Sequence, residues 1–455
     1  MYRRTVAVLG ITNFLSAMGI TVVVPFLGDV QGIFGVSPAY GIWIVTLFML
    51  SYCVGMAFVG RLSDAVGRRP VYIASMGTFA LGLLVSGVSP GFGGVLAGRF
   101  LQGLGASGTL PLAQAIAYKG FGARRGRMLG LISAAFGLGV VAAINLGGGI
   151  YTALGWRAVF LVTSVLAALG FAVSTLLPET STARRRPRYD PGGTIAFGTA
   201  IAGFMLLFKG LATGPLLSWE ALPYLILLLA AGGAFLLLET RAREPMIDLS
   251  LFRNRGFTGV ILASLLGGVG MFIFQTFLPS YAQLLLGYSV AQAAYSIDVM
   301  AAFMIAAAGL TGIACDRFGP ERVLLFSLAT TALAFYLITA IPAPTWAYYL
   351  GSAVAGVGLG SLMPPSSMAA IREAGPGREG ISSGLVSLSR TLGGIIGPTV
   401  GGLILARTNF SSLFALANIL NSYRNIYRFG LWTVLAGCGV ALFLLALRKK
   451  EVDER

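Results

Sequence analysis

The sequence predicts an all-α, polytopic membrane protein with 14 transmembrane helices, built as two pseudo-symmetric six-helix bundles plus an inserted helix pair. Composition is the first reason: of 455 residues, 56% are hydrophobic and 11% are charged, and the mean hydropathy is +0.84. A water-soluble domain cannot bury that much apolar surface, so lipid must be the solvent for most of the chain. The apolar segments are long, unlike the short alternating segments of a membrane barrel, and this favours helices.

Fourteen apolar stretches are long enough to cross, or nearly cross, a hydrocarbon core about 30 Å thick. The first six and the last six form the predicted bundles, and the seventh and eighth form the inserted pair. The predicted domains are an N-terminal six-helix bundle (1–177), a linker with two extra helices (178–256) and a C-terminal six-helix bundle (257–455). In chain order the stretches are 5–27, 40–59, 70–88, 92–118, 128–151, 158–177, 194–211, 222–238, 257–286, 293–314, 323–341, 346–371, 381–406 and 430–447.

The net charge of +16 indicates membrane topology and not nucleic-acid binding. Of the 32 Lys and Arg residues, 25 lie at the termini or in alternate loops, and four lie in the opposite loops. Cytoplasmic loops carry such an excess, so we expect a multi-pass protein of the cytoplasmic (inner) cell membrane with both termini in the cytoplasm. Basic loops also suit contact with membrane lipids.

Histidine is absent, and the three cysteines lie in or beside different spans. We therefore predict neither a metal site nor a disulfide framework. The first span is too long for the apolar core of a signal peptide and lacks a small-residue cleavage site, so no cleavable signal is expected.

One loop motif occurs in each half of the chain. The pattern Gly-x-x-x-Asp-x-x-Gly-x-Arg covers 60–69, and its first part returns 252 residues later at 312–319, with Arg322 behind it. Glycine and proline landmarks at 103–111 and 356–364 recur at nearly the same offset. Two related bundles in a bilayer are typical of secondary transporters, because alternating access is usually built from repeats.

These residues carry a resemblance to a known family. The segment 60–69 resembles the loop 2–3 motif of the major facilitator superfamily, and Arg99-x-x-Gln102-Gly103 resembles its fourth-helix motif. The segment 244–255 resembles the entry to the ninth span in the fourteen-helix branch. Over nearly its whole length the chain is thus similar to fourteen-helix drug:proton antiporters. The resemblance implies a transporter with a loop motif that stabilises one of the alternating conformations. An enzyme is not expected, because the sequence shows no span-end His/Asp/Glu cluster, nucleophile–base pair or phosphate loop.

Two positions depart from that branch. Ala143-Ile144 stand where antiporters of the family carry a Gly-Pro pair in the fifth span, and Ser16 stands where the drug antiporters typically carry an acid in the first span. The vestibule should then be neutral to electropositive. Neutral, zwitterionic or anionic amphipathic molecules, lipids included, are expected to fit better than cationic dyes.

The gating residues are predicted from the loop motif and from the thirteenth span. In the motif, glycines permit a tight turn and close helix approach, and a carboxylate near a helix start is stabilised by the helix dipole. A plain topology signal with a tight turn is the alternative. The predicted gating residues are Gly60, Asp64, Gly67, Arg68, Gly312, Asp316, Arg317, Gly397 and Pro398.

Four charges lie inside the predicted spans, where each costs about 2.5–3.5 kcal/mol at mid-membrane. Lys209 can extend to the interface. Asp298 is the predicted proton-coupling acid, or else an acid hydrated near the outer boundary; Arg99 shares in coupling, or else pins a helix as a hydrogen-bond donor. Arg390 is a candidate site residue whose alternative is also helix pinning. By their placement in the spans, the predicted substrate-binding residues are Asn13, Arg99, Gln102, Gln275 and Gln283.

The outer loop 407–429 is long, and one helical face of it carries Leu413, Leu416, Ala417, Leu420 and Tyr427. This predicts a helix lying in the membrane interface, or alternatively a mere connector.

The predicted function is export of amphipathic compounds of the multidrug efflux type by alternating access, coupled to proton entry as an antiporter. A dedicated exporter of lipids or other amphiphiles and an uncoupled uniporter stay open as alternatives. No cofactor is expected, since a proton gradient would supply the energy. The expected partners are a small amphipathic substrate and membrane lipids, with no nucleic acid, and the protein is expected to be a monomer.

Overall fold

The computed structural model describes residues 2–21, 32–36, 41, 43–178, 190–213, 216, 218–242, 245–340, 345–406 and 415–453. Over these residues the chain is helical, without a strand. It divides into two compact units. Unit 1 comprises Met1–Phe204, Leu227–Leu249 and Ala374–Leu385; unit 2 comprises Met205–Ile226, Ser250–Glu373 and Val386–Arg455. The predicted domain boundaries follow the sequence repeat instead, and they stay a prediction.

The described helices confirm the predicted fold class. Twelve of them are long and apolar enough to cross a membrane, judged by length and composition. Two more helices complete the predicted 14: α1, whose apolar part Arg4–Ile20 is slightly shorter, and α6, which carries Arg99, Gln102 and several glycines. The polar and small residues that lower the hydropathy of α6 are buried within unit 1.

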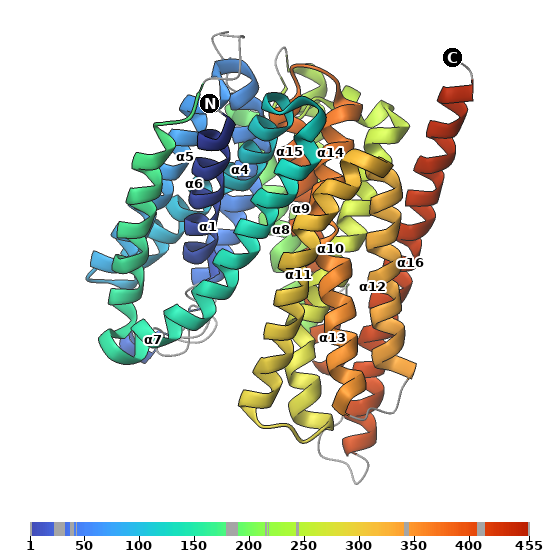
Figure 1. Cartoon of the computed structure of the whole chain (residues 1–455). Helices are drawn as coiled ribbons and strands as arrows, with labels where there is room; N and C mark the ends of the chain where they lie inside the picture. The colour runs from blue at the N-terminus through green and yellow to red at the C-terminus, as the bar shows by residue number, and fades with distance from the viewer. Residues whose placement is uncertain are drawn as a thin grey trace. The chain divides into compact units, whose positions relative to one another are not determined.

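Unit 1 contains the first five long helices. These are α1 (Tyr2–Thr21), α4 (Trp43–Val66), α5 (Arg68–Val88), α6 (Phe92–Gly120) and α7 (Arg125–Ser174), with a 3-10 turn η2 (Gly122–Arg124) before α7 (Figure 1). Helix α1 packs on α7, while α6 packs on both α4 and α5. Glycines allow the α5–α6 approach, because a side chain at Gly82 or Gly105 would overlap the backbone of the facing helix.

Helix α7 contains two of the predicted spans. It turns back on itself at Gly155, whose φ of 81° and ψ of 173° are non-helical, and Figure 1 shows the sharp bend. Glycine adopts this positive φ without a Cβ clash. The predicted spans 128–151 and 158–177 are therefore the two arms of one hairpin without an intervening loop.

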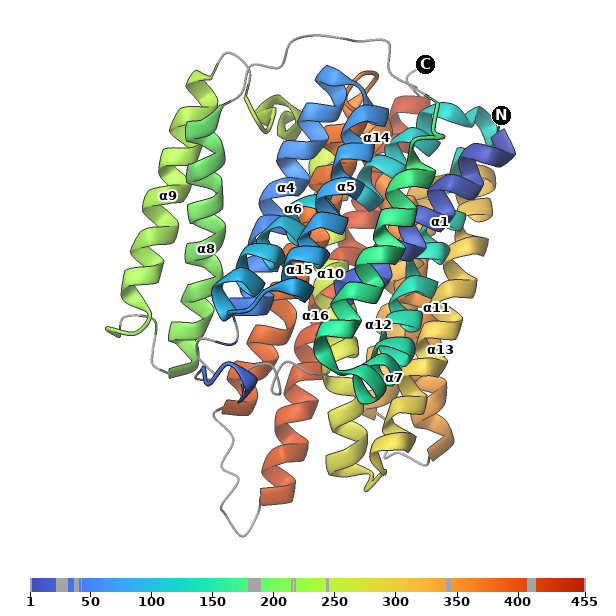
Figure 2. The same ribbon diagram turned by 90° about the vertical axis from the view of Figure 1, so that its left-hand side faces the viewer.

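The inserted pair consists of α8 (Pro191–Thr213) and α9 (Leu222–Arg241), which stand side by side in Figure 2. The rings of Phe197 and Phe235 lie 5.2 Å apart. Gly203 allows close approach, because a Cβ there would lie 2.9 Å from the backbone nitrogen of Leu228.

The remaining helices run from η3 (Leu249–Arg253) onward. They are α10 (Arg255–Leu285), α11 (Val290–Phe318), α12 (Pro320–Ala340), α13 (Thr345–Gly360), α14 (Met363–Ala374), α15 (Glu379–Ala406) and α16 (Ala415–Asp453). In unit 2, α13 packs on α11 and α12, and α16 packs on α10 and α12. The predicted span 346–371 is broken between α13 and α14, just before Pro364 and Pro365. Neither proline can donate the backbone hydrogen bond that would continue the helix.

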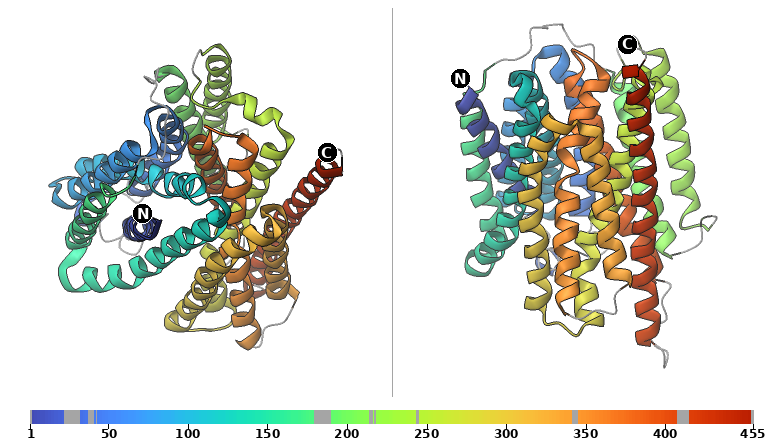
Figure 3. Two further views of the ribbon diagram at one scale, coloured as in Figure 1. Left: turned by 45° about the horizontal axis from the view of Figure 1, so that its top comes forward. Right: turned by 45° about the vertical axis from the view of Figure 1, so that its right-hand side comes forward.

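The predicted interfacial helix in the loop 407–429 is wrong for its described part. Residues 415–429 instead begin α16, the long helix that continues to Asp453 (Figure 3). Tyr423, Ile426 and Tyr427 are buried, and the rings of Tyr427 and Tyr281 lie 5.5 Å apart. Of the predicted face, Tyr427 therefore packs against protein, while Leu420 is half-buried and Ala417 is exposed. Leu413 and the side chain of Leu416 lie outside the described residues.

Candidate functional site

The first copy of the loop motif connects α4 to α5 without a loop. Gly67 is the single residue between the helices and has a φ of 118°. Its N–H donates to the carbonyl of Ser63 at 3.1 Å. This left-handed turn places the end of α4, which carries Asp64, beside the start of α5, which carries Arg68.

Asp64 caps a helix that lies more than 300 residues further along the chain. Its Oδ1 accepts from the backbone N–H of Gly380 and its Oδ2 from that of Ile381, both at 2.9 Å. These two N–H groups belong to the first turn of α15, where no carbonyl of the helix can accept from them. A carboxylate at this end also interacts favourably with the helix dipole. Asp64 therefore holds the start of α15 within unit 1.

Arg68 adds a buried ion pair to the same contact. Its guanidinium lies 2.5 Å from Oε2 of Glu379, the first residue of α15, and 3.5 Å from Oδ1 of Asp64. The Arg68 side chain is 1% exposed and that of Glu379 is 9% exposed. Removing one partner from such a pair leaves a buried charge uncompensated, which costs about 3–5 kcal/mol.

Glycines on both helices make the contact possible. A Cβ on Gly60 would lie 2.7 Å from the carbonyl oxygen of Gly380, and a Cβ on Gly380 would lie 2.8 Å from Oδ1 of Asp64. We call Gly60, Asp64, Arg68, Glu379 and Gly380 the latch. The structure thus brings together four predicted gating residues: Gly60 and Asp64 on α4, the turn at Gly67, and Arg68 on α5. Glu379 was not predicted, because nothing in the local sequence links it to residue 68.

The second copy of the motif is built differently. It ends α11, and Gly319 with a φ of 84° forms the turn into α12. Gly312 is buried, whereas Asp316 and Arg317 are exposed, and the guanidinium of Arg317 lies over the ring of Phe318. The roles of these residues in gating stay a prediction.

The buried acid of the second copy is Glu321, which the repeated motif did not predict. Glu321 is buried near the start of α12 and forms ion pairs with Arg372 of α14 and, at 3.1 Å, with Arg448 of α16. It occupies the position that Arg69 holds in the first copy, so a search for residues shared by the repeats does not find it. This ion network ties three helices of unit 2 together.

Arg99 and Gln102 on α6 form one connected group. Arg99 donates from Nε to the carbonyl of Ile44 at 3.0 Å and from Nη1 to Oε1 of Gln102 at 2.6 Å. Gln102 donates in turn to the carbonyl of Gly19 at 2.6 Å. The guanidinium lies 4.3 Å from the centre of the Phe48 ring, and both polar side chains are buried. The geometry matches the alternative of helix pinning, because the group links α6 to α4 and α1.

Asn13 lies in a row of buried polar residues on α1. Its Nδ2 donates to the carbonyl of Leu9 and to the hydroxyl of Tyr72, which also bonds Thr12 at 2.6 Å. Its Oδ1 is buried and has no hydrogen-bond partner among the described residues. Ser16, one turn further on, bonds Thr109 at 2.8 Å.

The predicted polar residues of unit 2 are scattered. Gln275 is half-buried, and Gln283 and Asp298 are exposed. Arg390 is buried, and its Nη2 lies 3.4 Å from Oγ of Ser387. Its carbonyl contacts Gly268 of α10, so α15 and α10 meet closely at this level.

Two further predicted gating residues lie on the same helix. A Cβ on Gly397 would lie 2.6 Å from the carbonyl of Val269, and Pro398 follows inside α15. Close packing and a missing backbone donor thus coincide here.

A tyrosine cluster in unit 2 also went unpredicted. Tyr348 donates to the carbonyl of Leu278 at 2.8 Å and contacts Oγ of Ser296 at 2.9 Å. Its ring stacks on that of Tyr281, at 6.3 Å between centres. The cluster contains Tyr281, Tyr288, Tyr348, Tyr349, Tyr423 and Tyr427. These residues come from three helices (α10, α13 and α16) and from the connection between α10 and α11, so their sequence spacing gives no signal.

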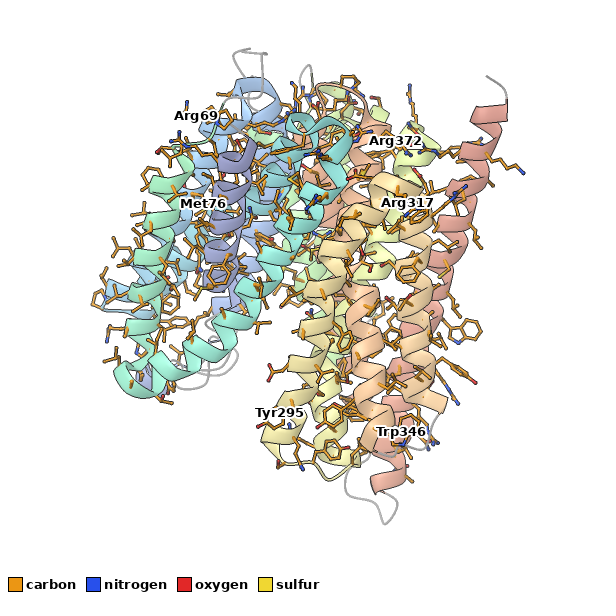
Figure 4. The ribbon with its side chains drawn as sticks, viewed as in Figure 1. Arg69, Met76, Tyr295, Arg317, Trp346 and Arg372 are labelled. Carbon is orange, nitrogen blue, oxygen red and sulfur yellow. The ribbon has the colours of Figure 1, made fainter. Side chains whose placement is uncertain are left out.

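A groove of about 700 Å³ runs between α11, α12 and α13 of unit 2. Its lining is apolar apart from Arg322 and two hydroxyl groups, and includes Phe303, Leu310 and Phe326. Arg317 and Arg372 lie toward one end of unit 2, and Tyr295 and Trp346 lie toward the other (Figure 4). An excess of basic residues at one end, and Tyr and Trp at the level of a membrane interface, are both typical of a membrane-spanning bundle.

Comparison with known proteins identifies the family. A family model described as the Major Facilitator Superfamily matches residues 9–313 and 299–453. The chain belongs to the major facilitator superfamily. This facilitator is therefore a polytopic membrane transporter and not an enzyme.

Individual relatives of this facilitator share about a quarter of its residues. An uncharacterized transporter of this superfamily, YfiU of Bacillus subtilis (strain 168), is 28% identical over 404 residues, covering 86% of this chain and 78% of the relative. Multidrug resistance protein 3 of the same organism is 27% identical over 400 residues, covering 86% and 77%. The crystal structure of the human organic anion transporter MFSD10 (TETRAN) matches with a TM-score of 0.67 and 19% identity, covering 95% of this chain and 99% of that one, and shows the shared fold.

Proposed function

We propose that this facilitator exports amphipathic compounds from the cell as a multidrug efflux pump that exchanges them for protons. Relatives at 26–27% identity are named multidrug resistance protein 3 and multidrug transporter protein MdtP. The basic loops support a place in the inner cell membrane with both termini in the cytoplasm. On this proposal the protein works as a monomer and needs no cofactor, because the proton gradient supplies the energy.

The latch is the observation that carries the proposal. It joins the loop motif of the first repeat to the first turn of α15, which by sequence belongs to the second repeat. Alternating access requires contacts between repeats that form in one conformation and break in the other. The latch suits this role, since it combines two capping hydrogen bonds with one buried ion pair. The latch adjoins the basic segments 61–69 and 372–378, which are predicted to lie on the cytoplasmic side. Formation of the latch would therefore close the transporter on that side.

The charges of unit 1 support the proposed substrate class. Arg99 is buried in α6 and pairs with no acid among the described residues, and α1 presents Thr12, Asn13 and Ser16 where drug antiporters typically carry an acid. Cations gain nothing from this set of residues. Neutral, zwitterionic or anionic amphipathic molecules are the proposed substrates.

A dedicated exporter of lipids or other amphiphiles is the second candidate, and the groove on unit 2 favours it. Its apolar lining matches an acyl chain, and Arg322 supplies a cation for an anionic headgroup. Transport of a phospholipid with no transport of dyes would favour this candidate.

Proteoliposomes with an imposed pH gradient test the proposal. The probes are ethidium, a neutral fluorescent dye and a fluorescent anionic phospholipid, and the variants are Asp298→Asn, Arg99→Ala and, as a control, Glu220→Gln. Glu220 is an exposed acid outside the latch. We expect the pH gradient to accelerate wild-type flux of the neutral or anionic probe. Asp298→Asn should lose this acceleration, and Arg99→Ala should lose the flux itself. The control Glu220→Gln should match wild type.

Two results would contradict parts of the proposal. Wild-type flux that ignores the gradient would indicate a uniporter. A response of Asp298→Asn equal to wild type would place the proton site elsewhere in the chain.

A further inference from the structure

The inserted pair carries a buried acid that has no role in the proposed proton-coupled export. Glu239 lies in the last turn of α9 and is 3% exposed. Its Oε1 accepts from the backbone N–H of Ile247 at 2.6 Å. Its Oε2 is buried and has no hydrogen-bond partner in the part of the chain that the structure describes.

A carboxylate oxygen of Asp190, which is also buried and without a hydrogen-bond partner among the described residues, lies nearby. Asp190 precedes α8, and its Oδ1 accepts from the backbone N–H of Gly193 at 2.9 Å. Its Oδ2 is buried and likewise without a partner among the described residues. Both oxygens lie close to the position that a Cβ on Gly193 would occupy. Such a Cβ would be 2.5 Å from Oδ2 of Asp190 and 3.4 Å from Oε2 of Glu239.

Within the described part of the chain, the charges near this point are mainly negative. Glu239 interacts electrostatically there with a second carboxylate, Asp190, and with one guanidinium, that of Arg61 of α4. The segment 245–249, which also packs here, contributes backbone N–H groups at Met246 and Ile247. Two carboxylates that share a buried site do not both ionise readily.

We propose that Asp190 and Glu239 bind one proton between them, as an O–H···O bond between the two free oxygens. The proton is the favoured ligand because a metal cation such as Ca²⁺ requires about six to eight oxygens, and the described residues leave two free here. The site lies at the end of the inserted pair, which gives this pair a function beyond crossing the membrane.

The proton site is connected to the latch through three successive contacts in unit 1. Glu239 holds the amide of Ile247 at 2.6 Å, and the next residue, Asp248, pairs with Arg378 at 3.0 Å. Arg378 directly precedes Glu379, the latch residue that binds Arg68. A proton shared by Asp190 and Glu239 fixes segment 245–249 and so keeps Arg378 in place. Loss of that proton makes the two carboxylates repel, which weakens the hold on the start of α15.

This inference rests on the proposed gating function of the latch, and hydrogen–deuterium exchange of the intact protein in nanodiscs tests both separately. The reporters are the amides of Gly380 and Ile381, which donate to Asp64. Between about pH 6 and pH 9, after correction for the intrinsic exchange rate, we expect wild-type protection to fall by about tenfold, which is the usual scale of coupling between two sites. Asp190→Asn and Glu239→Gln each supply an amide donor to the remaining carboxylate, so their protection is expected to stay high at both pH values.

A second measurement reads the proton directly. The infrared difference spectrum between the two pH values is expected to show a protonated carboxyl band that is lost in Asp190→Asn and in Glu239→Gln and kept in Glu220→Gln. Replacing sodium by choline should change nothing, because the ligand is a proton; a sodium-dependent band would overturn the assignment.

The outcomes separate the two ideas. Suppose that Asp64→Asn removes the protection of the Gly380 and Ile381 amides, while wild-type protection and the carboxyl band do not change with pH. The role of the latch is then supported, and the proposed proton site is wrong. If instead the band behaves as expected but Asp64→Asn leaves this protection unchanged, the proton site is supported and the proposed role of the latch is wrong. Protection that keeps its pH dependence in Asp190→Asn would overturn the coupling between them.

Discussion

The two copies of the loop motif share a spacing but use different acids. In the first copy the buried acid is Asp64, which caps α15, while Arg68 pairs with Glu379. In the second copy Asp316 is exposed, and the buried acid is Glu321, which pairs with Arg372 and Arg448. One copy therefore holds the start of a helix from the other repeat, and the other copy ties helices of unit 2 together. A repeated motif can thus preserve its turn while its charges take different tasks.

The largest effect is expected at the ion pair of the first copy. Arg68→Ala leaves Glu379 buried without its cation, which should cost about 3–5 kcal/mol. We expect a marked loss of transport and a lower melting temperature, measured in detergent by intrinsic fluorescence. Arg69→Ala is the matched control, since Arg69 donates to the carbonyl of Thr175 and does not bind Glu379.

The double variant sharpens this test. Adding Glu379→Gln to Arg68→Ala removes the buried charge, so part of the lost stability should return. A double variant no more stable than Arg68→Ala would show that the ion pair does not account for the loss.

A smaller effect on stability is expected in the second copy. Glu321→Gln weakens the contacts to Arg372 and Arg448, but both arginines are partly exposed and water can solvate them. We expect a loss of about 1.5–3 kcal/mol, as for a hydrogen bond to a charged group, with unchanged transport per folded molecule. A specific loss of transport at full stability would instead give Glu321 a gating role and remove the difference between the copies.

The smallest effect is expected from one methyl group. Gly60→Ala would place a Cβ 2.7 Å from the carbonyl of Gly380, so the latch must separate at a cost of about 1–3 kcal/mol. Transport should fall, and the amide of Gly380 should exchange faster, while the rest of unit 1 keeps its protection. Gly319→Ala in the second copy is the control: it strains the turn at a φ of 84° without touching the latch, so exchange at Gly380 should not change.

Local patterns in the sequence were sufficient to predict the helices and the latch residues of the first repeat, which are Gly60, Asp64 and Arg68. Hydropathy located the spans, and the spacing of Gly60, Asp64 and Gly67 indicated the turn. Glu379 could not be found, because its pairing with Arg68 joins residues 311 positions apart and depends on how the helices pack. The acids Asp190 and Glu239 were missed for the same reason.

The internal repeat predicts only residues that both halves share. Glu321 was missed because an arginine, Arg69, stands at its position in the first copy. The interfacial helix was predicted wrongly in the loop 407–429 for another reason. An apolar position such as Tyr427 is equally suited to lipid and to the aromatic side chains of neighbouring helices, and periodicity does not distinguish the two.

The hairpin in α7 has a mechanical consequence. Since Gly155 alone joins its two arms, there is no slack that would let one arm slide along its axis past the other. Any axial shift of residues 128–151 must be transmitted to residues 158–174, so both arms of the hairpin travel together during the transport cycle.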